Sequence, residues 1–241
     1  GMTLSNAPAL IGIAHGSRNP DAAAVTESLV SAAGARLGIE AHAAYLEDFA
    51  SPSITEVAKM LAEHGYSSAV AVPLLFTEAY HATEDAPTEL REAKAAHGIE
   101  LVQAEVLGTG AEMVDVLATR LDQGEGDHPR GEIILLAVGS SRPGANEAVQ
   151  ALGDDLSACT GRSVHVRFAT CEPRINDRLE KAKGPGTVLP LFAAPGLLLD
   201  RARERAQDAG WLVLDHLGDA LAPIVAARYE DALSRLNARE T

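Results

Sequence analysis

Short apolar runs alternate with amphipathic segments along the chain, and this alternation predicts its secondary structure. In the first half the runs that predict buried strands are 10–14, 41–46, 69–76 and 99–106. Apolar residues at helical spacing predict helices over 22–37, from Ser51-Pro52 onwards with Pro52 at the first helical position, and over 111–121. Strands that alternate with helices form parallel sheets covered on both faces, so we predict an α/β fold.

The pattern then starts again. Residues 133–140 (Ile-Ile-Leu-Leu-Ala-Val-Gly-Ser) follow the same plan as residues 10–17 (Leu-Ile-Gly-Ile-Ala-His-Gly-Ser). Two later matches come in the same order: Pro190-Leu191-Phe192 with Pro73-Leu74-Leu75, and Leu217-Gly218 with Leu107-Gly108. Three ordered matches predict an internal duplication.

The duplication predicts two domains, each a parallel sheet of about four strands with helices on both faces. A polar segment rich in glycine separates the halves. We therefore expect an N-terminal domain over 2–122, a linker over 123–131 and a C-terminal domain over 132–241.

A candidate metal site comes from polar residues that follow strands in the first half. His15 follows the first predicted strand, Glu47 the second and His81 the third. In a doubly wound sheet of order 2-1-3-4, these three strand ends meet at one edge. Two imidazoles and a carboxylate suit a divalent transition metal with open coordination positions, although either imidazole could accept a proton instead. The simpler alternative is that His15 caps a turn and His81 caps a helix.

Composition and charge exclude several partners. The formal net charge of −14 argues against nucleic acid and against an anionic membrane surface. No signal peptide and no membrane-spanning run is evident, and two widely spaced cysteines suit a reducing compartment, so we expect a cytoplasmic protein. No GxxxxGK[ST] motif is present, so any reaction is expected to run without a nucleotide.

The motifs in the first half resemble those of the sirohydrochlorin chelatase family (CbiX or SirB-like), whose members are class II, ATP-independent chelatases. His15-Gly16-Ser17, followed by Arg18, matches the family's HGS motif. Residues 73–81 and 85–87 match a second motif, roughly PLFLxxGxHxxxDIP. Here Ala79 replaces its glycine and Ala86 its isoleucine.

This resemblance implies a flavodoxin-like fold and insertion of Co²⁺ or Fe²⁺ into a sirohydrochlorin-type tetrapyrrole, for cobalamin or siroheme synthesis. It implies that His15 and His81 are metal ligands or proton acceptors and that Glu47 is a further ligand. The residues that it places near the substrate are Gly16, Ser17, Arg18, Ala79 and Asp85. The metal is then a substrate, and the chain is expected to be a monomer with a pseudo-twofold internal repeat.

Two other interpretations remain. Histidine phosphatases also have a histidine on a glycine turn after the first strand, but Ala14 stands where their arginine would be. A metal- or tetrapyrrole-binding protein without turnover is the second alternative. In the second half Val138 aligns with His15 and Leu198 with His81, so we expect no metal site there and a wall for the macrocycle instead.

Overall fold

The computed structural model describes residues 7–79, 81–128 and 131–240, apart from the side chains of His81, Arg239 and Glu240. Within these ranges none of the helices is both long and apolar enough to cross a membrane. The elements of the first half are β1 (Ala9–Ala14), α1 (Pro20–Leu37), β2 (Ala41–Tyr45), α2 (Ile54–Glu63), β3 (Ser68–Pro73), a π-helical turn (His81–Asp85), α3 (Ala86–His97) and β4 (Glu100–Gln103). Those that follow are α4 (Ala111–Glu125), β5 (Glu132–Ala137), α5 (Ala145–Thr160), β6 (Val164–Phe168), α6 (Ile175–Lys181), β7 (Gly186–Pro190), α7 (Leu197–Asp208), β8 (Leu212–Val213), a 3₁₀ turn (Gly218–Leu221) and α8 (Ala222–Glu240).

Two four-stranded parallel sheets confirm the predicted fold. Their strand orders are β2-β1-β3-β4 and β6-β5-β7-β8, so the 2-1-3-4 order assumed for the first half is present in both halves. Backbone hydrogen bonds repeat at the strand ends: Glu47 N–H donates to the His15 carbonyl, as Thr170 N–H donates to the Val138 carbonyl. The duplication seen in the sequence therefore holds at the level of individual hydrogen bonds.

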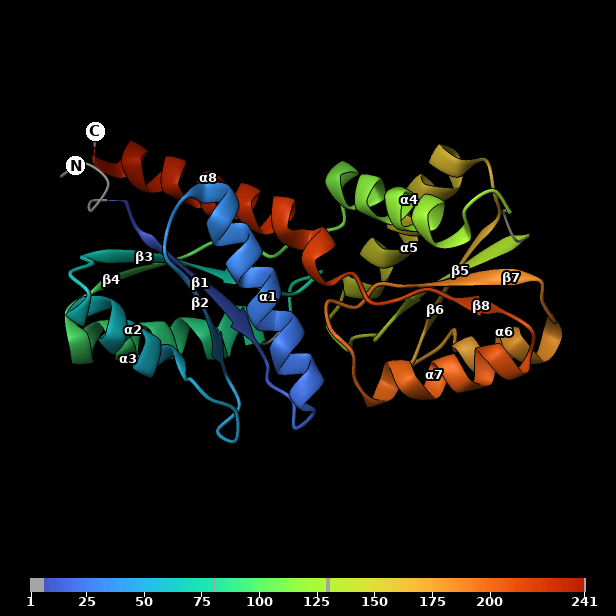
Figure 1. Cartoon of the computed structure of the whole chain (residues 1–241), viewed down its shortest axis with the longest axis horizontal. Helices are drawn as coiled ribbons and strands as arrows, with labels where there is room; N and C mark the ends of the chain where they lie inside the picture. The colour runs from blue at the N-terminus through green and yellow to red at the C-terminus, as the bar shows by residue number, and fades with distance from the viewer. Residues whose placement is uncertain (1–6, 80, 129–130, 241) are drawn as a thin grey trace. The chain divides into compact units, whose positions relative to one another are not determined.

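Helices cover both faces of the first sheet. α2 and α3 bury their apolar faces with alternate residues of β1 and β3, while α1 and α8 lie on the opposite face (Figure 1). Gly12 allows the close approach of α1, because a Cβ at this position would lie 2.3 Å from Val30 Cγ2. The continuous apolar strands noted in the sequence are thus buried on both sides, as parallel strands require.

Several predicted boundaries are wrong by a few residues: β4 ends at Gln103 rather than at residue 106, and α4 continues to Glu125 rather than ending at residue 121. Strand β3 ends at Pro73 rather than at residue 76. Helix α2 begins at Ile54, because Ser53 caps it and forms a capping box with Glu56. Pro52 therefore lies before the cap and not at the first helical position.

The two compact units of the chain are not the two halves of its sequence. One unit comprises residues 1–108 and 218–241, and the other residues 109–217. The closing helix of each repeat has been exchanged: α4 packs with α5 on the second sheet, and α8 packs with α1 on the first. These units differ from the predicted domains 2–122 and 132–241.

The end of α4 shows why the predicted linker is partly structured. Glu125, which falls within the predicted linker over 123–131, is the last residue of α4 and accepts hydrogen bonds from Arg162 and from the Thr187 hydroxyl. Only 4% of the Glu125 side chain is exposed, so this paired carboxylate holds the end of α4 in the second unit.

The contacts of α8 are equally specific within the first unit. The Tyr229 hydroxyl donates a 2.6 Å hydrogen bond to the Pro8 carbonyl, and burial raises the pKa of Tyr229 to about 12. The Arg228 guanidinium donates to the carbonyls of Val106 and Leu107, in the segment that leaves β4. Helix α8 therefore completes the first unit.

Candidate functional site

The carboxyl edge of the first sheet collects the residues that follow β1, β2 and β3. Strand β1 is central, and its last residues pair with Tyr45 of β2 and Pro73 of β3. The chain after β2 stays attached to the chain after β1, since Glu47 N–H donates to the His15 carbonyl at 2.9 Å. The backbone therefore fixes His15 and Glu47 beside each other.

Their side chains also meet. His15 Nε2 lies 2.9 Å from Glu47 Oε1, and the two side chains are 45% and 38% exposed. The pair is thus open to solvent on one side and held by the sheet on the other. An imidazole and a carboxylate so arranged can share a proton or bind one metal ion between them.

Gly16 sets the turn that makes this pairing possible. Its φ of +114° lies in the left-handed region that favours glycine. A Cβ here would lie 2.9 Å from Ala50 Cβ and 3.2 Å from Glu47 Cβ, so a side chain would push against the loop that carries Glu47.

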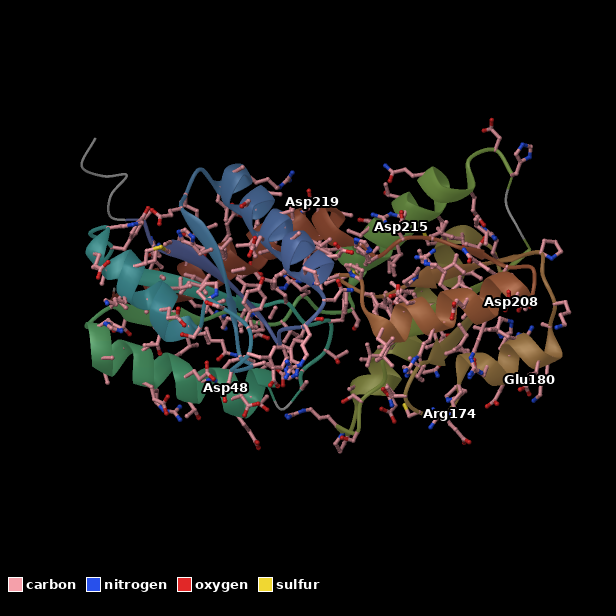
Figure 2. The ribbon with its side chains drawn as sticks, turned by 60° about the horizontal axis from the view of Figure 1, so that its bottom comes forward. Asp48, Arg174, Glu180, Asp208, Asp215 and Asp219 are labelled. Atoms are coloured by element: carbon pink, nitrogen blue, oxygen red, sulfur yellow. The ribbon has the colours of Figure 1, made fainter. Side chains whose placement is uncertain are left out.

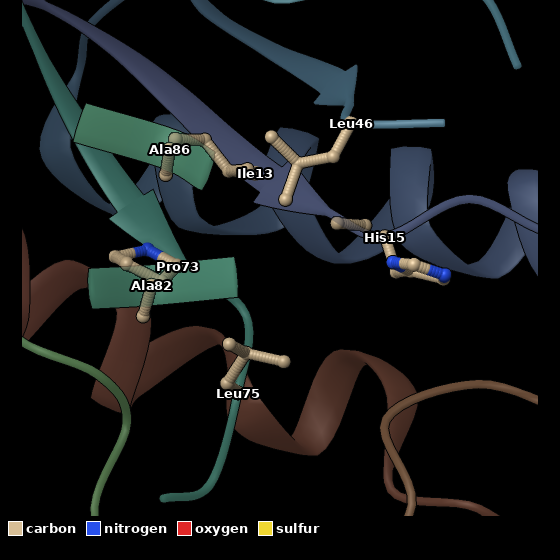
Figure 3. A pocket seen from close by; sticks show the side chains of 8 residues that line it. Ile13, His15, Leu46, Pro73, Leu75, Ala82 and Ala86 are labelled. Atoms are coloured by element: carbon tan, nitrogen blue, oxygen red, sulfur yellow. The ribbon is translucent and has the colours of Figure 1, made fainter. Parts of the chain in front are cut away.

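A small apolar pocket lies next to His15 (Figure 3). Its volume is about 230 Å³, counted with the open space at its mouth. The lining comes from the ends of β1 and β3, from the loops after β1, β2 and β3, from the π-helical turn and from the start of α3: Ile13, Ala14, His15, Leu46, Pro73, Leu75, Ala82 and Ala86. Among the described residues of this lining, His15 alone has a polar side chain, so an apolar group bound there would contact the imidazole. Sequence reasoning noticed Ala86 only as a departure from a motif.

His81 begins the π-helical turn that follows the loop after β3. Its backbone therefore stands at the same edge as His15, as the strand order predicts, but its side chain lies outside the described residues. Among the side chains that are described, no group of three His, Cys, Asp or Glu residues is arranged to hold a metal ion. The three-residue ligand set His15, Glu47 and His81 thus stays a prediction.

Three further predicted residues are Ser17, Ala79 and Asp85, and the first two have identifiable local roles. The Ser17 hydroxyl accepts a hydrogen bond from Asn19 N–H and supports the turn before α1. The Ala79 carbonyl accepts hydrogen bonds from the N–H groups of Ala82 and Thr83. Because the φ angle of Ala79 is not positive, alanine fits at this position, where the motif has glycine. Asp85 ends the π-helical turn and makes no capping hydrogen bond to α3.

Arg18 lies over an aromatic ring that the sequence analysis missed. Its guanidinium carbon is 4.2 Å from the ring centroid of Phe49, a side chain that is 46% exposed. The Phe49 ring supplies a flat apolar surface, and the Arg18 guanidinium stacked on it supplies a positive charge. The sequence did contain a sign of this contact, namely an aromatic residue in the polar loop between Asp48 and the Ser51-Pro52 turn.

The same edge is acidic. Burial and the nearby carboxylates of Glu92, Asp85 and Asp48 raise the pKa of Glu89 above its ordinary value. Asp48 comes from the loop after β2 and is labelled in Figure 2. A surface that disfavours further negative charge in this way attracts cations.

The second half keeps the backbone of this site but not its chemistry. Val138 takes the place of His15, and Thr170 takes the place of Glu47 with its hydroxyl donating to the Val138 carbonyl at 2.7 Å. Gly139 has φ of +97°, like Gly16. The turn is therefore conserved between the repeats, whereas the imidazole–carboxylate pair is present only in the first.

Comparison with known proteins finds relatives that match most of the chain. The sirohydrochlorin ferrochelatase of Priestia megaterium is 25% identical over 244 residues, which cover 94% of this chain and 91% of that protein. The structure described as SirB from Bacillus subtilis with Fe³⁺ superposes with a TM-score of 0.83 at 18% identity, covering 96% of this chain and 97% of that one. The structure of the sirohydrochlorin chelatase SirB from Bacillus subtilis subspecies spizizenii in complex with cobalt superposes with a TM-score of 0.79 at 19% identity. The match covers 95% of this chain and 96% of that one. The CbiX family model matches residues 9–124 and again residues 132–232, so the chain belongs to the CbiX family of sirohydrochlorin chelatases.

Proposed function

We propose that this chain inserts Co²⁺ or Fe²⁺ into a sirohydrochlorin-type tetrapyrrole without consuming ATP, in the synthesis of cobalamin or siroheme. The observation that carries the proposal is the 2.9 Å pair of His15 and Glu47, half-exposed beside an apolar pocket at the carboxyl edge of the first sheet. Membership of the CbiX family and similarity to a ferrochelatase support it.

In this proposal the metal first binds at the edge of the sheet. His15, Glu47 and His81 supply two nitrogens and a carboxylate, which leaves positions open for the incoming ring nitrogens. Acidic residues around the site, such as Asp48, raise the local concentration of a divalent cation. Exposure of the pair means that the metal is held weakly enough to be passed on.

The reaction must also remove protons. Insertion of M²⁺ replaces two pyrrole N–H protons, so the products are the metallated ring and two protons. A neutral imidazole that has given up the metal accepts one of them, and solvent takes the other. One of the two histidines, His15 or His81, thus acts first as a ligand and then as the base.

The substrate is held by its ring and by its charges. Apolar residues beside His15 contact the macrocycle, and Arg18, presented on Phe49, pairs with a peripheral carboxylate.

The test is anaerobic incubation with sirohydrochlorin and Co²⁺ or Fe²⁺ in the absence of ATP, followed by absorbance. We expect metallation faster than in the protein-free reaction. His97→Ala is the matched control for His15→Ala, since His97 ends α3 at the opposite edge of the sheet. A spectrum that shifts on mixing but never reaches the metallated form would instead support the non-catalytic binding protein.

A further inference from the structure

The π-helical turn that begins at His81 contains a carbonyl that its own hydrogen-bond pattern cannot satisfy. In such a turn the carbonyl of each residue accepts from the N–H group five positions later. For Ala82 that position is Pro87, which has no N–H group. Ala82 is only 6% exposed, and a buried carbonyl without a donor lowers stability. The turn therefore needs a donor from another part of the chain.

The side chain of Gln103 supplies this donor. Gln103 is the last residue of β4, the edge strand beside β3. Its Nε2 atom donates a partly buried hydrogen bond of 2.6 Å to the Ala82 carbonyl, across 21 positions of the sequence. The bond ties the turn to the sheet at the residue directly after His81.

This tie is made inside the candidate site. Ala82 belongs to the lining of the apolar pocket beside His15 (Figure 3). On the other side of His81, the Ala79 carbonyl accepts from the N–H groups of Ala82 and Thr83. Neighbouring residues share a rigid peptide plane, so a displacement of Ala82 would move the backbone of His81 with it.

The second repeat lacks both the turn and the glutamine. Gln103 pairs with Ala71 in the register of β3 and β4, and the equivalent pair in the second sheet is Val188 with Val213. Val213 is buried in the apolar core of its unit. Within residues 186–208, all of which the structure describes, β7 leads to α7 without a π-helical turn. The amide and the histidine after the third strand are thus present together in one repeat and absent together from the other.

We propose that Gln103 is a positioning residue for His81. Its hydrogen bond to Ala82 holds the π-helical turn so that the imidazole reaches a metal ion beside His15 and Glu47. This inference rests on the proposed function, in which His81 is a metal ligand. Ligand distances in a metal site vary by only about 0.2 Å, so a turn that relaxes into another hydrogen-bond pattern takes His81 out of reach.

Gln103→Met tests the proposal, because methionine keeps the length and flexibility of the side chain but removes the donor. We expect the full chain to bind Co²⁺ about tenfold more weakly and to metallate sirohydrochlorin about tenfold more slowly, with unchanged circular dichroism. Gln103→Glu keeps the shape of glutamine and replaces the donor with an oxygen, so it gives a second variant for the same comparison.

Leu101→Met is the matched control. Leu101 lies two residues earlier on β4, so its side chain is on the same face of the strand, where it packs against the core of the first unit. Its replacement removes no side-chain hydrogen bond. The variant should bind Co²⁺ and metallate sirohydrochlorin as the parent does.

The His81→Ala background distinguishes a positioning role from a purely structural one. If Gln103 acts through His81, adding Gln103→Met to His81→Ala should change Co²⁺ affinity by less than about twofold. Where that affinity is too weak to titrate, the metallation rate gives the same comparison. A general loss of stability would instead weaken both backgrounds alike. A loss of equal size in both backgrounds, or parental Co²⁺ affinity in the folded single variants, overturns the inference.

Co²⁺ binding also separates this inference from the proposed function. If Co²⁺ affinity depends jointly on Gln103 and His81 but the parent does not metallate sirohydrochlorin, the proposed reaction fails and the inference stands. If the parent metallates sirohydrochlorin and Gln103→Met does so at the same rate with the same Co²⁺ affinity, the inference fails alone. A parent chain that neither binds Co²⁺ nor metallates the ring overturns both.

Discussion

The turn at Gly16 allows the site to be disturbed without removing any polar group. Gly16→Ala adds one methyl group at φ of +114°, where it would lie 2.9 Å from Ala50 Cβ and 3.2 Å from Glu47 Cβ. Both neighbours belong to the loop after β2. The methyl group can be accommodated only if that loop or the His15 turn moves, and either movement separates His15 from Glu47.

The structure gives the size of the effect. A non-glycine residue in this part of φ/ψ space costs about 1–3 kcal/mol of stability. For a chain of this size, that corresponds to a fall in Tm of about 2–4 °C per kcal/mol. Displacing Glu47 by about 1 Å should lower the metallation rate by up to about 100-fold and weaken Co²⁺ binding with it.

Gly139→Ala is the matched control, because Gly139 occupies the same turn in the second repeat. Its φ is +97°, and a Cβ there would lie 2.7 Å from Cys171 Sγ and 2.8 Å from Thr170 Oγ1. Calorimetry should show both variants destabilised, whereas a Co²⁺ titration should show lost affinity only for Gly16→Ala. Equal Co²⁺ affinity in the two folded variants would refute the role given to the Gly16 turn.

Four further outcomes follow from the same structure. His15→Ala and His81→Ala should each lower the metallation rate about 100-fold with unchanged circular dichroism, and near-normal turnover in either would remove that histidine from the site. Glu47→Gln should cost less than either, since water replaces a carboxylate ligand more easily than an imidazole; a larger loss would reverse that ranking in the same assay. Glu89→Gln should raise Tm at pH 7, because the raised pKa of Glu89 shows that its charged form is unfavourable in the folded state. The gain in Tm should vanish as the pH falls and Glu89 becomes protonated. A Tm difference between variant and parent that does not change with pH would contradict this. The fragment 1–121, which lacks α8, should not fold by circular dichroism, and a native-like spectrum would show that α8 is dispensable.

The strands followed from the sequence because they depend on short-range patterns, whereas their order was an assumption taken from doubly wound folds. Four apolar runs separated by helical segments admit few topologies, and the assumed order 2-1-3-4 is the one that the structure has. Boundaries were less accurate where one side chain decides them. At α2, for example, the capping box of Ser53 and Glu56 outweighs the preference of Pro52 for the first turn.

The site was predictable where strand ends determine it. His15 and Glu47 follow neighbouring strands, so topology alone brings them together, and the 2.9 Å contact agrees. Phe49 and the apolar pocket were not predictable in this way. Their positions depend on how loops fold over the edge, and the loop sequence does not carry a periodic signal.

The exchange of closing helices explains why the duplication was visible but the compact units were not. Family membership follows sequence repeats, and the match to residues 9–124 and 132–232 keeps α4 with the first repeat and α8 with the second. Packing follows apolar faces, and these pair α4 with the second sheet and α8 with the first. Since both helices are amphipathic and both follow a Leu-Gly pair, nothing in their own sequence distinguishes one sheet from the other. Long-range contacts decide instead, such as that of Tyr229 with Pro8 in the first unit. Each repeat therefore depends on the other for a helix, so the second repeat has to be kept even though it lacks the imidazole–carboxylate pair.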